Sequence, residues 1–155
     1  MDDTAPTAGS FCTCADAVPA APGAYILAVE LAEALTLALP GKPAATLGPG
    51  RYLYCGSARG PGGLRARLRR HMARGKAIRW HIDNLSETGT VLGTWVFPDE
   101  SECELAGRLA SLPVPIAGFG STDCRRCHSH LFRWAGAAMP AVALRARGRK
   151  DTHAQ

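Results

Sequence analysis

Two tyrosines and a later arginine–histidine pair are the residues of this chain best suited to chemistry. Gly23-Ala24-Tyr25 opens an apolar run, and Tyr54-Cys55-Gly56 closes another. A glycine-rich gap follows, and then a basic segment in which Arg67 and His71 are four residues apart. A guanidinium fork matches pairs of phosphate oxygens. The combination therefore indicates phosphodiester chemistry, whereas either tyrosine alone would be read as part of a sheet.

Composition and charge limit the class of protein. The 155 residues suffice for one domain with a sizeable core. Eighteen Lys and Arg against 13 Asp and Glu give a net charge of +5, carried mainly by Arg. No apolar run approaches the roughly 20 residues of a membrane helix, and the acidic N-terminus does not fit a signal peptide. We therefore expect a cytoplasmic protein without a membrane partner, in which the six Cys are reduced.

Apolar periodicity predicts the elements that position these residues. The patterns predict strands at 25–31, 35–39, 51–55 and 90–97, helices at 63–74, 77–87 and 100–112, and a short final element at 131–134. This order favours an α+β domain with a small mixed or antiparallel sheet of three to four strands flanked by helices. We expect a flexible leader at 1–20, the domain at 21–135 and a flexible basic tail at 136–155.

The motifs and their order resemble the GIY-YIG nuclease superfamily. The two tyrosine segments and Arg67-x-x-x-His71 match its core pattern. Four later segments resemble an uncharacterised branch of this superfamily, namely Trp80-His-Ile-Asp83, Glu102-Cys-Glu-Leu-Ala106, Gly118–Cys124 and Ser129–Phe132. The resemblance covers roughly residues 22–134. It implies a Mg²⁺- or Mn²⁺-dependent DNA endonuclease, structure-selective or non-specific and related to repair.

The resemblance also implies a role for each matching residue. Tyr25 would activate the attacking water, Tyr54 would support the site and share that role, and Arg67 would contact the scissile phosphate. His71 matches a site histidine, and His81 matches a position where some relatives carry a second one. A phenol with a pKa near 10 is a poor base. We therefore expect cations, namely Arg67, His71 and the metal ion, to favour the phenolate.

The resemblance places the metal ligand on the later helix, where the sequence offers Glu102 and Glu104. Leu105, Ala106 and Leu109 lie three, four and seven residues after Glu102, so Glu102 borders the apolar face of this helix. Glu104 points roughly 100° away from that face. Both acids also fit capping boxes at a helix start, which is the alternative role. We expect Glu102 to hold the metal and keep Glu104 as the second candidate.

DNA is the expected partner, and RNA is not excluded by these residues. Phosphate contacts are expected from Arg59, Arg65, Arg69, Arg70, Arg125 and Arg126. Such contacts give salt-dependent and largely sequence-independent binding. Many relatives carry an Asn after the metal helix, and this chain has none beyond Asn84, so Ser129, His130 or another polar group would replace it. This departure favours the main alternative, a nucleic-acid-binding module of the same fold that does not cut.

The cysteines allow a competing chemistry. Cys124-x-x-Cys127 has metal-ligand spacing, and together with Cys12-x-Cys14 it could supply four thiolates to zinc. One such pair without a well-spaced partner is a weak signal, so we expect reduced or packing cysteines. A zinc-stabilised interaction domain is the third hypothesis.

The two tyrosine segments are separated by a strand at 35–39 and a Gly/Pro spacer, which predict an inserted hairpin that leaves the sheet intact.

Overall fold

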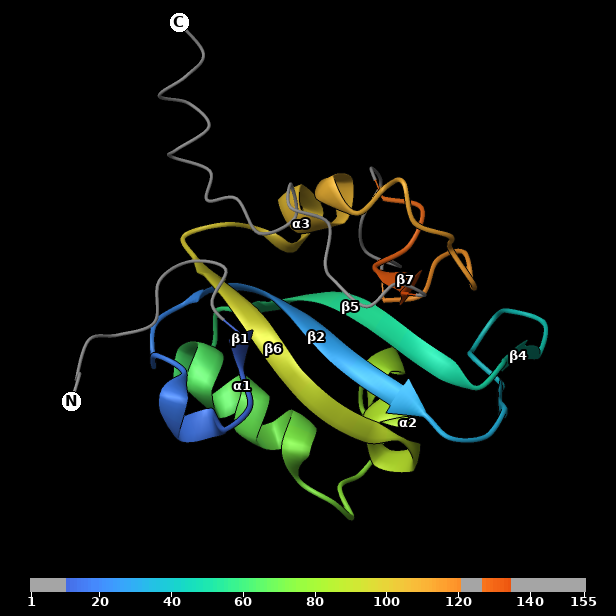
Figure 1. Cartoon of the computed structure of the whole chain (residues 1–155), viewed down its shortest axis with the longest axis horizontal. Helices are drawn as coiled ribbons and strands as arrows, with labels where there is room; N and C mark the ends of the chain where they lie inside the picture. The colour runs from blue at the N-terminus through green and yellow to red at the C-terminus, as the bar shows by residue number, and fades with distance from the viewer. Residues whose placement is uncertain (1–10, 121–126, 135–155) are drawn as a thin grey trace, which may run out of the picture.

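The computed structural model describes residues 11–120 and 127–134 of the chain (Figure 1). Within these residues, five strands form one antiparallel sheet in the order β1-β6-β2-β5-β7, and β3 and β4 form a separate two-stranded sheet. The strands of the larger sheet are β1 (Phe11–Cys12), β2 (Gly23–Leu31), β5 (Gly50–Ala58), β6 (Thr90–Pro98) and β7 (Leu131–Trp134). The α+β class is confirmed, with an antiparallel sheet that has more strands than predicted.

The central strand β2 is buried on both faces, which explains its almost continuous apolar sequence. Alternate side chains of a strand point to opposite faces. Tyr25 and Leu27 belong to one core cluster, and Ala24 and Ile26 belong to the other. The first cluster is covered by α1 (Gly63–Met72) and α2 (His81–Thr88), and the second by α3 (Glu102–Arg108) (Figure 1).

Helices α1 and α2 turn their apolar residues towards the same face of the sheet. In α1, Leu64 and Leu68 are buried, as the sequence predicts. Helix α2 begins at residue 81 and not at 77, because Trp80 is its extended N-cap residue. The Asp83 carboxylate accepts a hydrogen bond from the Trp80 backbone N–H at 2.9 Å, which satisfies a donor at the helix start.

Helix α3 is shorter than the predicted span of 100–112. It begins at residue 102 because Ser101 and Glu104 form a capping box. The Ser101 hydroxyl accepts from the Glu104 N–H at 3.1 Å, and the Glu104 carboxylate accepts from the Ser101 N–H at 2.9 Å. After Arg108, hydrogen bonds between residues three apart replace the α-helical pattern, so the chain continues in tight turns.

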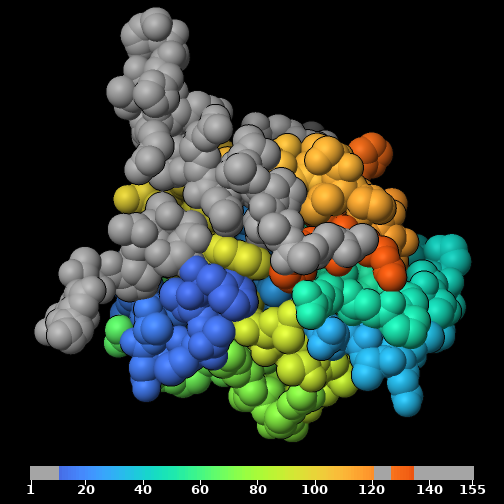
Figure 2. All heavy atoms as spheres, viewed as in Figure 1, coloured from blue at the N-terminus to red at the C-terminus, as the bar shows by residue number. Residues whose placement is uncertain are grey.

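A short hairpin separates β2 from β5. Its strands are β3 (Leu35–Leu37) and β4 (Ala45–Leu47), in which the Thr36 and Thr46 hydroxyl oxygens are 3.0 Å apart. Figure 2 shows this hairpin, in cyan, at one end of the molecule. Strands β2 and β5 pair along their whole length, so the predicted insertion does leave the sheet intact.

The segment before β2 belongs to the fold, so the flexible leader predicted for 1–20 is wrong from residue 11 onwards. Strand β1 pairs with β6, a 3₁₀ turn follows at Ala15–Ala17, and Val18 is buried. This segment covers an edge of β6 that would otherwise expose unpaired backbone groups. Residues 1–10 and the predicted tail lie outside the described residues. In the described part of the chain, no helix is both long and apolar enough to cross a membrane.

Candidate active site

Tyr25 and His71 form a buried hydrogen-bonded pair. The Tyr25 hydroxyl oxygen lies 2.7 Å from His71 Nε2, and the two residues are 3% and 1% exposed. Tyr25 pairs with Gly56 across β2 and β5, and its ring folds over this glycine. A Cβ atom at residue 56 would lie 2.3 Å from the phenol oxygen. The packing of the Tyr25 ring therefore requires glycine at position 56.

Burial sets the charge states of this pair. It lowers the pKa of His71 from 6.5 to about 3, against the opposing effect of Asp83. Burial and the neighbouring Tyr54 raise the pKa of Tyr25 well above its ordinary value, while Arg67 acts to lower it. At neutral pH both groups are neutral, and in the tautomer protonated at Nδ1 the imidazole accepts the phenol hydrogen. The expectation that a cationic His71 favours the phenolate is therefore wrong, whereas Arg67 acts in the expected direction.

Tyr54 and Arg67 lie beside the pair, near the point where the pairing of β5 with β7 ends. The Tyr25 and Tyr54 ring centroids are 6.3 Å apart, on the same face of the sheet. Strand β7 pairs with β5 as far as Tyr54. Just beyond this point, Arg67 Nη1 donates to the Ser57 carbonyl at 2.7 Å. The structure thus places a guanidinium at the end of β5 beyond its pairing with β7, next to both phenols.

Glu102 and Glu104 differ in their surroundings. The Glu104 carboxylate caps α3, so the structural role considered from the sequence holds for this residue. Glu102 is half-buried, and its carboxylate makes no hydrogen bond to another described residue. Burial raises the pKa of Tyr54, and the nearby charge of Glu102 adds to that increase, while Arg67 opposes it. Although α3 covers the opposite face of the sheet, the charges of Glu102 and Arg67 therefore both shift the pKa of Tyr54, in opposite directions.

His81 stands further from the Tyr25–His71 pair. Its Nδ1 accepts a hydrogen bond from the Gly120 N–H at 2.8 Å, and its ring packs on Phe119 with centroids 5.4 Å apart. Phe119 in turn packs edge-on against Tyr54, with centroids 6.2 Å apart. Among the described contacts, His81 is thus linked to the tyrosines through Phe119.

The arginines predicted to bind phosphate differ in their accessibility. Arg59 and Arg69 are exposed. Arg65 donates to the Val18 carbonyl at 2.8 Å and holds the N-terminal segment, while Arg70 is paired with a buried carboxylate. Arg69 also forms an exposed ion pair with Asp16 at 3.1 Å, so three of these four arginines have partners within the described residues. Outside the described residues lie Arg125 and Arg126.

Asp83 and Trp80 are site residues to which the sequence analysis assigned no role. Asp83 is fully buried and accepts from Arg70 at 2.6 Å and from the Arg79 and Trp80 N–H groups at 2.8 and 2.9 Å. Burial opposes its charge, but these hydrogen bonds hold the pKa of Asp83 below its ordinary value. The Trp80 ring is contacted by the Arg67 and Arg70 guanidinium groups, 4.5 and 4.6 Å from its centroid. The spacing of Trp80 and Asp83, three residues apart, is a capping signal in the sequence. It does not reveal that the Asp83 carboxylate faces the site.

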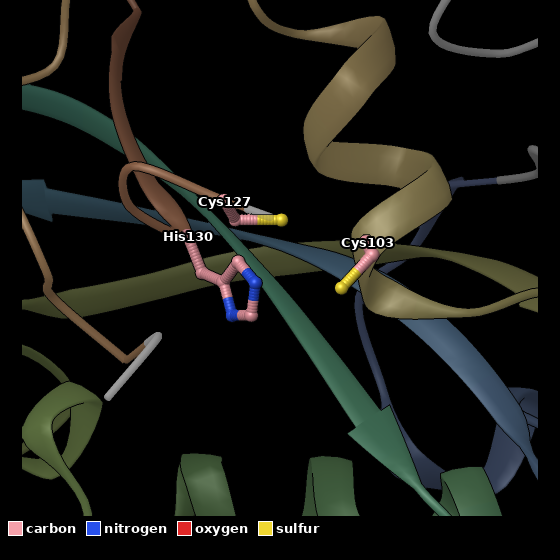
Figure 3. A group of neighbouring side chains, drawn as sticks. All are labelled: Cys103, Cys127 and His130. Carbon is pink, nitrogen blue, oxygen red and sulfur yellow. The ribbon is translucent and has the colours of Figure 1, made fainter. Parts of the chain in front are cut away.

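A second group of reactive side chains lies near the start of α3. Cys103, Cys127 and His130 place one potential ligand atom each within 4.8 Å of one another (Figure 3). Of the four thiolates considered as an alternative zinc set, Cys12 lies on β1, at the opposite edge of the sheet from β7, whereas Cys127 lies shortly before β7 in the chain. Cys124 lies outside the described residues.

Fold and site together define an α+β protein in which an antiparallel sheet carries a buried tyrosine–histidine pair flanked by a guanidinium and a carboxylate. The family described as a domain of unknown function, DUF123, matches residues 24–150, and the chain belongs to this family. No curated protein matches the chain, and neither does any solved structure.

Proposed function

We propose that the protein is a divalent-metal-dependent DNA endonuclease of the GIY-YIG type. The observation that carries the proposal is the 2.7 Å hydrogen bond between Tyr25 and His71. Beside this pair, the charges of Arg67 and Glu102 both influence the pKa of Tyr54. The two residues belong to helices that cover the two faces of the sheet. This proximity of residues distant along the chain supports a site for phosphodiester hydrolysis.

The tyrosine–histidine pair supplies a base for the attacking water. As the water oxygen bonds to phosphorus, its proton passes to Tyr25 Oη, and the phenol proton passes to His71 Nε2. The bond from phosphorus to the leaving oxygen breaks, and that oxygen keeps the electron pair and takes a proton from solvent. A positive charge then forms on the imidazole, which its burial disfavours, and the nearby Asp83 carboxylate offsets part of that cost. Asp83 is accordingly a positioning residue in this proposal.

Negative charge on the phosphate oxygens requires preorganised cations. The Arg67 guanidinium, at the end of β5 beyond its pairing with β7, supplies one of them. The half-buried Glu102 carboxylate fits Mg²⁺ or Mn²⁺, because such ions are commonly held by one or two carboxylates together with waters and phosphate oxygens. When bound, the ion would stabilise charge on the phosphate and on the leaving oxygen.

The expected substrate is DNA, cut in a structure-selective or non-specific manner during repair. Arg59 and Arg69 are exposed and best placed for phosphate contacts among the predicted arginines, although Arg69 would have to exchange its surface ion pair with Asp16 for a phosphate. A net charge of +5 supports a polyanionic partner in general, so the assay includes RNA beside DNA.

A nicking assay tests the proposal. Supercoiled plasmid, branched DNA and RNA are incubated with Mg²⁺ or Mn²⁺, and initial rates are compared for the wild type and its variants. Tyr25→Phe and Glu102→Gln should each lower the rate by about 100-fold or more. Glu104→Gln is the matched control, because Gln preserves the capping box and the rate should be unchanged. A folded wild type that cuts no nucleic acid with either metal would refute the proposal.

A nucleic-acid-binding module that does not cut is the second candidate. The raised pKa values of Tyr25 and Tyr54 favour it, because both phenols are then neutral at pH 7. This candidate predicts DNA binding that weakens steeply with salt, with no metal-dependent nicking in the same samples.

A further inference from the structure

We propose that Cys103, Cys127 and His130 form a zinc site, separate from the tyrosine–histidine pair. The three side chains come from the first turn of α3 and from the segment that leads into β7. Figure 3 shows the imidazole and the two sulfur atoms facing a common space between these elements. Two thiolates and one imidazole are a typical part of a zinc ligand set.

The spacing of the three atoms suits a tetrahedral ion after a small adjustment. Zinc–sulfur bonds of about 2.3 Å and zinc–nitrogen bonds of about 2.0 Å place neighbouring ligand atoms roughly 3.5–3.8 Å apart. The ligand atoms of the group lie within 4.8 Å of one another, so they need to approach by no more than roughly 1.3 Å. Rotation of the cysteine and histidine side chains is sufficient for this approach, and the fourth position is open to water or to a further ligand.

His130 supplies an observation that points to a ligand independently of the cysteines. This residue is 3% exposed, and its Nε2 atom is buried without a hydrogen-bond partner among the described residues. A buried polar atom without a partner is costly. An ion bound by Nε2 would give this buried nitrogen a partner.

Access and charge also fit a cation. A cavity of about 420 Å³ lies against α3 and is lined by both cysteines of the group, which provides a path of entry. Deprotonation of the two thiols on binding would give two negative charges that neutralise a divalent ion. The Glu102 carboxylate lies near enough to His130 to influence its titration, and it adds to the negative potential of the site.

The site would fix the position of α3. Cys103 directly follows Glu102 in the chain, and the His130 carbonyl accepts a hydrogen bond from the Cys55 N–H of β5 at 2.8 Å. An ion held by these ligands would therefore connect the start of α3 to the end of the sheet beside Tyr54. This inference stands whether or not the protein cuts nucleic acid.

Metal analysis and cobalt substitution of the full chain test the site. The protein is purified without chelators or a histidine tag, its zinc content is measured by mass spectrometry, and the metal-free form is titrated with Co²⁺ or Zn²⁺. We expect about one zinc per chain and the cobalt spectrum of a tetrahedral site with thiolate charge-transfer bands. Cys103→Ser and Cys127→Ser should each weaken binding more than about 100-fold, because even outer-shell changes cost about 10- to 100-fold.

Three variants separate this site from its alternatives. Cys14→Ser is the matched control, since this exposed cysteine lies outside the group, and it should bind zinc as the wild type does. His130→Cys should retain tetrahedral cobalt with an added thiolate, which distinguishes loss of a ligand from loss of the fold. Glu102→Gln should keep its zinc even where nicking is lost.

Some results would overturn the inference. One is a folded wild type with neither zinc nor a thiolate–cobalt spectrum. Another is cobalt binding that Cys103→Ser leaves unchanged, because the ion would then be held elsewhere.

Discussion

Replacing Gly56 by Ala should displace Tyr25 from its partner. The new Cβ would lie 2.3 Å from both Cζ and Oη of Tyr25, whereas carbon atoms in normal contact are about 3.5–4.0 Å apart. The ring must therefore retreat by roughly 1 Å or more. That movement stretches the 2.7 Å bond to His71 Nε2 beyond the range of a hydrogen bond.

Two consequences follow, and they have different magnitudes. Overpacking of this kind costs about 1–3 kcal/mol of folding free energy. If the pair is the base of a nuclease, a displacement of about 1 Å should lower the rate of nicking by about 100-fold. The loss of activity at Gly56→Ala should then be much larger than the loss of folded protein.

Urea unfolding and plasmid nicking of the same preparations measure both effects, with rates normalised to the folded fraction from circular dichroism. Gly60→Ala is the control, because a Cβ at that position meets nothing within 4 Å, and both stability and rate should match the wild type. If Gly56→Ala were as stable as the control, the packing argument would be refuted. Reduced stability with a wild-type rate of nicking would instead refute the role of the pair in cleavage.

Three further predictions concern residues around the pair. Stability should fall as the pH decreases from 6.5 towards 3, since the unfolded chain protonates His71 while the folded state, with a pKa of about 3, does not. The slope from this residue is at most about 1.4 kcal/mol per pH unit, and urea unfolding at pH 7 and pH 4.5 should show a smaller loss for His71→Gln. Asp83→Asn should cost about 3 kcal/mol in thermal unfolding, because Arg70, with a side chain only 23% exposed, loses its counter-charge. Glu104→Ala should lower stability by about 0.5–1.5 kcal/mol through the lost cap at Ser101, and should leave nicking per folded molecule unchanged.

Local patterns in the sequence account for much of the fold. The apolar run from Tyr25 marks a strand buried on both faces, and Leu64 and Leu68 mark the inner face of α1. Both depend on neighbours within a few residues, which is why periodicity detects them. Strand β1 escaped prediction because its two residues are stabilised by pairing with β6, about 80 residues later in the chain.

For the candidate site, the sequence by itself determined the kinds of group available: two phenols, a guanidinium, a histidine four residues later and two acids on one helix. Tertiary structure decided what each can do. Burial by distant elements, and not residue type, makes His71 a neutral acceptor. The capping box that occupies Glu104 leaves Glu102 to act on Tyr54. Cross-strand register explains Gly56, and chain reversal brings His130 to Cys103. Desolvation and proximity depend on segments far apart along the chain, so spacing in the sequence cannot reveal them.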